Sequence, residues 1–156
     1  MHGTGGSLED FGESITSALA RDFEVIAIDR PGHGYSSRPV AHADTPLDQA
    51  RLVHRVLKSI GRSIIWIVGH SWSGALALAY ALSARYAKLA SPVIVLTGIA
   101  DRFIDPQNQS LRFAREQPTA SLIPLTATCH QVPMVWAEAV VDAIRRLAAS
   151  PAPTET

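Results

Sequence analysis

The spacing of hydrophobic and polar positions changes repeatedly along the chain, and it predicts helices that alternate with short buried strands. Helices are predicted where apolar residues recur every three or four positions, where Ala and Leu dominate, or where a start signal such as Thr45-Pro46 stands. These segments are residues 8–20, 46–60, 74–86, 105–116 and 133–150. Strands are predicted where short apolar runs show little alternation, as in strands covered on both faces. These segments are residues 23–29, 63–68, 92–97 and 120–125.

This alternation predicts an α/β protein with a mostly parallel sheet of about four strands flanked by helices. The chain has 156 residues, close to the ~150 of a typical domain, so we expect one domain over residues 1–150 and a frayed tail at 151–156. Hydrophobic residues make up 47% of the chain and charged residues 18%, which indicates a globular protein.

Charge and cysteine content exclude several classes of function. Fourteen basic residues balance fourteen acidic ones, so no net field attracts nucleic acid. The single cysteine, Cys129, has no partner for an internal disulfide or a Cys-based metal site. We see no secretory signal and none of the ~18 consecutive apolar residues that cross a bilayer, so we expect a cytoplasmic protein without membrane contact.

The most informative segment is the turn between a predicted strand and a predicted helix, Gly69-His70-Ser71-Trp72-Ser73-Gly74. Its small residues let the backbone turn sharply and lift the Ser71 hydroxyl above the strand. Amides at the start of a helix have no intrahelical acceptor, so the Trp72 amide could bind the oxyanion that forms when Ser71 attacks a carbonyl group. The pattern therefore favours a catalytic serine over an ordinary Gly/Ser turn.

A serine hydroxyl needs a base to attack at neutral pH, and the base needs an anion to orient it. Asp101 and His130 each follow a predicted strand. Because parallel strands end at the same edge of a sheet, we expect Asp101, His130 and Ser71 to converge there. Asp105 is the second choice for the acid, although the proline after it fits a helix cap better.

Three segments resemble motifs of the α/β-hydrolase family, in the same order along the chain. His2-Gly3-Thr4-Gly5-Gly6 is similar to the His-Gly oxyanion loop, residues 29–36 are similar to a structural loop after a strand, and the Ser71 turn resembles the nucleophile elbow. The resemblance extends through Leu147, and it implies that the Thr4 amide is the second oxyanion donor.

Two departures from the family pattern shape the expected fold. Ser73 stands where the elbow usually has its last glycine, and a serine is small enough to fit there with slightly looser packing of helix against strand. Only Met1 precedes the His-Gly loop, and too few residues lie between positions 85 and 92 for a cap. We therefore expect a reduced α/β-hydrolase-like fold without a lid. A homodimer would cover its exposed sheet edge and apolar helix faces.

The expected function is hydrolysis of small carboxylic esters by Ser71, His130 and Asp101, through an acyl-enzyme intermediate and without a metal or organic cofactor. An open site without a lid favours small soluble esters over lipids. Two alternatives stay open. The same residues could serve perhydrolysis or acyl transfer, or the chain could be a non-catalytic remnant that acts as a binding or oligomerisation module.

Overall fold

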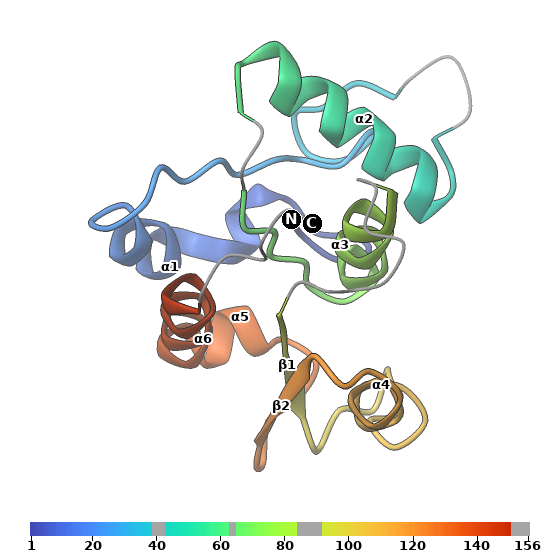
Figure 1. Ribbon diagram of the computed structural model, residues 1–156, viewed down its shortest axis with the longest axis vertical. Helices are drawn as coiled ribbons and strands as arrows, with labels where there is room; N and C mark the ends of the chain where they lie inside the picture. The colour runs from blue at the N-terminus through green and yellow to red at the C-terminus, as the bar shows by residue number, and fades with distance from the viewer. Residues whose placement is uncertain (39–42, 63–64, 84–91, 151–156) are drawn as a thin grey trace. The chain divides into compact units, whose positions relative to one another are not determined.

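The computed structural model describes residues 1–38, 43–62, 65–83 and 92–150, and the chain divides into two compact units (Figure 1). The first unit consists of Met1–Gly12 and Phe23–Lys88, and the second of Glu13–Asp22 and Leu89–Thr156. The expected single domain over residues 1–150 stays a prediction. The expected frayed tail at 151–156 lies outside the described residues.

The first unit is built around two helices, α2 (Pro46–Ser59) and α3 (Trp72–Ser83), and it also holds the short 3-10 helix η1 (Leu8–Phe11). The Thr45 hydroxyl caps α2 by accepting a hydrogen bond from the Asp48 amide, with 3.2 Å between the Thr45 Oγ1 and the Asp48 nitrogen. The helix ends before Gly61, whose φ of +72° suits glycine. The helices at 46–60 and 74–86 are thus confirmed, with α3 beginning at Trp72, and residues 84–86 lie outside the described part.

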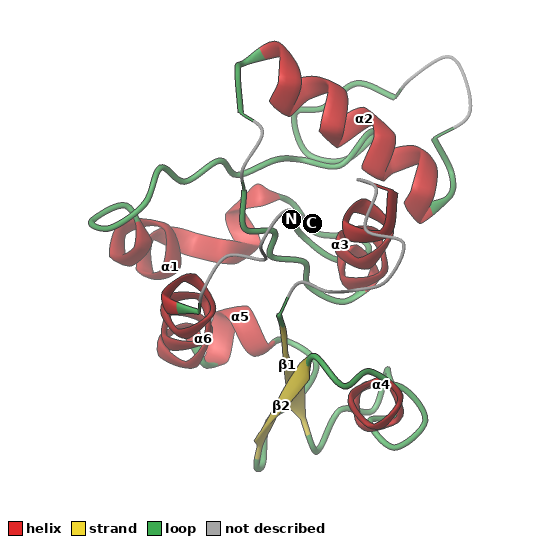
Figure 2. Ribbon diagram, viewed as in Figure 1, coloured by secondary structure: helices red, strands yellow, loops and turns green. Residues whose placement is uncertain are grey.

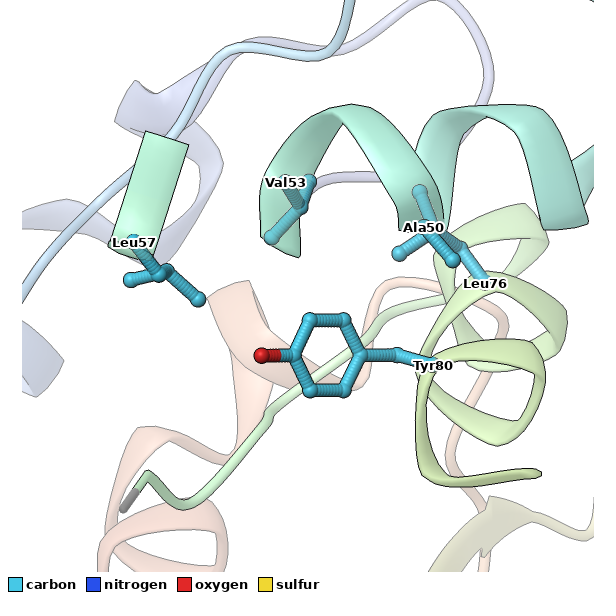
Figure 3. Packing of buried hydrophobic residues seen from close by; sticks show 5 residues of the cluster. All are labelled: Ala50, Val53, Leu57, Leu76 and Tyr80. Atoms are coloured by element: carbon cyan, nitrogen blue, oxygen red, sulfur yellow. The ribbon is translucent and has the colours of Figure 1, made fainter. Parts of the chain in front are cut away.

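The core of the first unit lies between α2 and α3. Figure 3 shows the Tyr80 ring of α3 beside the apolar side chains of α2. The buried residues of this cluster are Ala50, Val53, Leu57, Leu76 and Tyr80. Spacings of three and four on α2 put its members on one face, as the apolar periodicity predicted. This packing fixes α3, the helix that begins immediately after Ser71.

The second unit contains the parallel strands β1 (Val93–Gly98) and β2 (Ala120–Leu125), which pair from Val93 with Ala120 to Gly98 with Leu125. Between them runs α4 (Ser110–Glu116), and after them come α5 (Val132–Val135) and α6 (Ala137–Ala149). Figure 1 shows α4 on one side of the two strands and α5 and α6 on the other. The helix α1 (Gly12–Leu19) belongs to this unit except for its first residue. The α/β class with parallel strands flanked by helices is confirmed.

Three helix predictions are confirmed with changes to their bounds or continuity. The expected helix at 105–116 begins only at Ser110, because Asp105 closes a turn by accepting the Gln107 amide at 3.0 Å. The expected helix at 133–150 is broken at Trp136 into α5 and α6. The segment at 8–20 is also divided, into η1 and α1.

Two strand predictions need correction. Residues 23–29 form a loop and not a strand (Figure 2), and residues 24–27 are exposed. Residues 65–68 also lack strand structure, while residues 63–64 lie outside the described part. A strand forms only where a neighbour completes its hydrogen bonds, and an apolar run contains no information about that neighbour. Among the described residues, no helix is long and apolar enough to cross a membrane.

Candidate active site

Ser71 lies in a strained turn directly before α3. Its φ is +54°, in the left-handed region, which costs a residue other than glycine about 1–3 kcal/mol. Gly69 makes the turn possible, because a Cβ at that position would collide with the backbone carbonyl of Ser73. The turn therefore holds the Ser71 hydroxyl at the N-terminal end of a helix, as the small residues of the motif predicted.

The His-Gly loop lies against this turn. The Met1 carbonyl accepts the His70 amide at 3.0 Å, which places the first residues of the chain alongside the segment that leads to Ser71. A Cβ on Gly3 would lie 2.9 Å from the Ser71 Cβ and 3.4 Å from the Ser71 Oγ. Only glycine leaves room for this approach, so the backbone of the loop comes directly beside the hydroxyl.

The oxyanion donors predicted from the sequence are the backbone amides of Thr4 and Trp72. The two amides that follow Trp72 are not candidates, because those of Ser73 and Gly74 donate hydrogen bonds to the carbonyls of His70 and Ser71, at 3.0 and 2.8 Å. Within residues 1–38, 43–62, 65–83 and 92–150, no hydrogen bond from the Thr4 or Trp72 amide to the protein is present. Their role as oxyanion donors stays a prediction. Both belong to the same unit as Ser71.

The buried guanidinium of Arg30 supports the loop, and the sequence analysis missed it. Only 3% of Arg30 is exposed. Its Nε donates to the His2 carbonyl at 3.2 Å and its Nη2 to the Gly3 carbonyl at 2.9 Å. Its Cζ lies 4.4 Å from the centre of the Trp72 ring, so the indole face also contacts the cation. Burial lowers the pKa of Arg30. The only signal in the sequence was its place inside the 29–36 motif.

The imidazole of His2 also stabilises the loop to which this residue belongs. Its Nε2 accepts the Arg30 amide at 2.9 Å, so Nδ1 holds the proton and donates to the Gly3 carbonyl at 2.8 Å. Burial is the main cause that lowers the pKa of His2, and the charge of Arg30 adds to it, whereas the bond to the Gly3 carbonyl raises the pKa in part. The folded state therefore favours the neutral ring.

Asp29 ties together three segments of the first unit. Its two carboxylate oxygens accept the amides of Leu8 and Tyr35, at 2.6 and 2.9 Å. Burial alone would raise the pKa of Asp29, but these bonds and the nearby rings of His2 and His33 lower it overall. The 29–36 segment thus acts as a structural loop, which is the role that the family resemblance implied.

Asp101 and His130 lie together in the second unit. Asp101 follows β1 and His130 follows β2, and the parallel pairing brings the two loops to one edge of the strands. The Ala100 amide donates to the Thr128 carbonyl at 3.1 Å and so connects the loops directly. The His130 Nδ1 lies 2.8 Å from the Asp101 Oδ2. Asp105, the second choice for the acid, instead closes its own turn.

The surroundings of Asp101 keep it ionised. Burial raises its pKa, but this effect is outweighed by hydrogen bonds from His130 and from the amides of Ile104 and Phe103, so the pKa of Asp101 is lowered. A carboxylate can only accept, so the proton on the neutral imidazole of His130 lies on Nδ1. Its Nε2 then has a lone pair that can take a proton from a hydroxyl group.

The structure groups the five predicted site residues into two sets. Ser71, Thr4 and Trp72 belong to the first unit, and Asp101 with His130 to the second. The convergence of the two sets stays a prediction. Among the described residues, no cluster of three or more His, Cys, Asp or Glu side chains is placed to bind a metal ion.

Comparisons with known proteins show which family the chain resembles. Residues 1–117 match the model of the alpha/beta hydrolase fold family. The chain is 33% identical over 101 residues to the dihydrolipoyllysine-residue acetyltransferase component of the acetoin cleaving system of Cupriavidus necator. The matched residues are 65% of this chain and 26% of that protein. It is 31% identical over 107 residues to Protein ABHD8 of Homo sapiens, covering 68% of this chain and 24% of that protein. The chain thus spans about a quarter of the length of these relatives.

A solved structure shows a similar fold. The crystal structure of a predicted CIB-like hydrolase from Thermoplasma acidophilum superposes with a TM-score of 0.81, over 95% of this chain and 83% of that one. The two sequences are 18% identical over the superposed residues, so this similarity concerns the fold alone.

Proposed function

Because the chain belongs to the alpha/beta hydrolase fold family, we propose that it is a serine hydrolase that cleaves small carboxylic esters. The observation that carries the proposal is the strained Ser71 at the start of α3, with the backbone of Gly3 close to its hydroxyl. Strain of this kind persists only where the surrounding structure enforces it, and it is common at catalytic residues.

In the proposed reaction, Ser71 Oγ attacks the ester carbonyl while His130 Nε2 takes the hydroxyl proton. The amides of Thr4 and Trp72 bind the negative oxygen of the tetrahedral intermediate. When this intermediate collapses, the carbon–oxygen bond to the alcohol breaks, and His130 returns the proton to the leaving alcohol. Water then attacks the acyl-enzyme by the same route and releases the acid and free Ser71.

Asp101 has two roles in the proposal. Its bond to Nδ1 selects the tautomer of His130 in which Nε2 has the lone pair that accepts a proton, and its charge stabilises the imidazolium that forms during attack. The lowered pKa of Asp101 supports this role, because the carboxylate then stays charged across neutral pH.

The test is the hydrolysis of p-nitrophenyl acetate by the purified chain and by Ser71→Ala. We expect the variant to lose at least ~1000-fold in kcat, because the triad acts as a unit. A fluorophosphonate should also label the wild-type chain at Ser71, as shown by mass spectrometry, and leave Ser71→Ala unlabelled. Equal hydrolysis by both proteins would refute the enzyme proposal and favour the non-catalytic module.

Acyl transfer is a second candidate for the same site. It is favoured by the similarity to a protein named as an acetyltransferase component. The two activities share the acyl-enzyme and differ in whether water or another nucleophile receives the acyl group. Adding alcohols or thiols to the assay and measuring the products separates them, because transfer gives a new ester or thioester in place of the free acid.

A further inference from the structure

We propose that Ser73 is a positioning residue, whose hydroxyl ties the oxyanion loop to the first turn of the nucleophile's helix. This inference rests on the proposed function and deepens it. Ser73 is completely buried, and its Oγ donates to the carbonyl of His2 at 2.5 Å. The two residues lie 71 positions apart in the sequence.

The direction of this hydrogen bond is unusual for a helix serine. A serine within a helix commonly bonds to a carbonyl of its own preceding turn, and a serine at the helix start commonly caps an amide. Ser73 lies in the first turn of α3 but donates out of the helix to the loop. Its hydroxyl thus fixes the loop and adds nothing to the backbone hydrogen bonds of α3.

The hydrogen bonds around the loop hold two consecutive peptide planes. The His2 carbonyl accepts from Ser73 Oγ and from Arg30 Nε, and the Gly3 carbonyl accepts from Arg30 Nη2 and His2 Nδ1. A peptide group is planar, so fixing a carbonyl also fixes the direction of the N–H on its other side. The second plane contains the Thr4 N–H, which is the proposed oxyanion donor.

Ser73 ties the loop to the helix that follows the nucleophile, by holding the peptide plane that directly precedes the plane of the Thr4 N–H. It lies two residues after Ser71 on the same turn, whereas Arg30 contacts the loop from the 29–36 segment and His2 belongs to the loop itself. The loop has little packing of its own beyond Gly3: Thr4 and Gly5 are exposed, and a Cβ on Gly5 would meet nothing within 4 Å. The position of the Thr4 amide relative to Ser71 Oγ therefore depends on hydrogen bonds, and the Ser73 bond connects the two sides.

The test compares the wild-type chain with Ser73→Ala and Ser73→Gly, which remove the hydroxyl without adding bulk. Removing an oxyanion donor costs about 100- to 1000-fold in kcat, and loosening one costs less. We expect kcat for p-nitrophenyl acetate to fall roughly 10- to 100-fold while KM changes less than about twofold, because the donor acts in the transition state. The rate of fluorophosphonate labelling should fall in parallel.

A second measurement does not depend on activity. Amide hydrogen exchange in residues 3–6 should become faster in both variants, with exchange in α2 unchanged. The matched control is Ser59→Ala, which removes a hydroxyl-to-carbonyl bond of 2.7 Å at the end of α2 in the same unit and should change neither kcat nor exchange in the loop.

The outcomes separate the two proposals. Unchanged kcat in Ser73→Ala, or a loss of kcat that is matched by a rise in KM and by faster exchange throughout the unit, would overturn the positioning role. A wild-type chain without esterase activity would refute the proposed function, and unchanged loop exchange in Ser73→Ala would then also refute the tether.

Discussion

The hydrogen bonds of single side chains set the chemistry of the candidate site. The contact between His130 Nδ1 and Asp101 Oδ2, 2.8 Å long, determines which imidazole nitrogen can act as the base. Two hydrogen bonds from the backbone amides of Ile104 and Phe103 hold the carboxylate in the orientation that this contact requires. A change of one atom in Asp101 is therefore expected to affect catalysis without disturbing the fold.

Asp101→Asn tests this expectation. Asparagine keeps the shape of the side chain, but its neutral amide can present an N–H to His130, which favours the tautomer with its proton on Nε2. We expect kcat for p-nitrophenyl acetate to fall by about 1000- to 10,000-fold, with a thermal midpoint close to that of the wild type. A variant that retains more than a tenth of the wild-type kcat would contradict the role of Asp101.

The predicted catalytic residues lie at the ends of helices and strands, which position them. Ser71 precedes α3, and Asp101 and His130 follow β1 and β2, so all three lie in turns whose anchors are packed elements. The packing of α3 on α2 helps to maintain the strained φ of Ser71, because α3 begins at the next residue. The stability of the helix pair is thus a condition for the geometry of the nucleophile.

Leu76→Ala measures how much this packing contributes. Leu76 is completely buried between α2 and α3, and removing its side chain should lower the free energy of unfolding by about 2–5 kcal/mol, as measured by urea denaturation. The matched control is Leu82→Ala in the same helix. Leu82 is 51% exposed, and we expect a change of about 0.5 kcal/mol or less. Similar losses in the two variants would contradict the packing described for α3.

At the scale of the whole molecule, buried titratable groups couple folding to pH. His2, Asp29 and Asp101 all have lowered pKa values in the folded state. For His2, the unfolded chain takes up a proton near the ordinary value of 6.5, while the folded chain resists it. For the two carboxylates, the stabilising charge is complete above the ordinary value of 3.8 and is lost as the pH falls below it.

We therefore expect His2 to contribute a decrease in the free energy of unfolding as the pH falls below about 6.5, and the two carboxylates to contribute a further decrease below about 3.8. Urea denaturation of the purified chain between pH 8 and pH 3 measures both steps. His2→Asn should be less stable at pH 8 but should lose the step near pH 6.5. If the variant keeps that step, another group is responsible for it.

The local features of this protein could be predicted from its sequence. The caps and apolar faces of the main helices, the sharp turn at Ser71 and the loops that contain Asp101 and His130 depend on residues close together in the chain. The family resemblance added the His-Gly loop and the Thr4 amide. The strand predicted at 23–29 was wrong because a strand depends on a neighbour, which an apolar run does not specify.

Only the tertiary structure could show the contacts between distant segments. The bonds from Arg30 and Ser73 to the His2–Gly3 loop join residues 27 to 71 positions apart, and no local pattern marks either side chain as a support of that loop. Propensity and periodicity act over a few residues, whereas a buried donor takes whichever carbonyl the packed chain brings to it. The sequence thus determined which residues have the chemistry, and the packed chain determined which groups hold them in place.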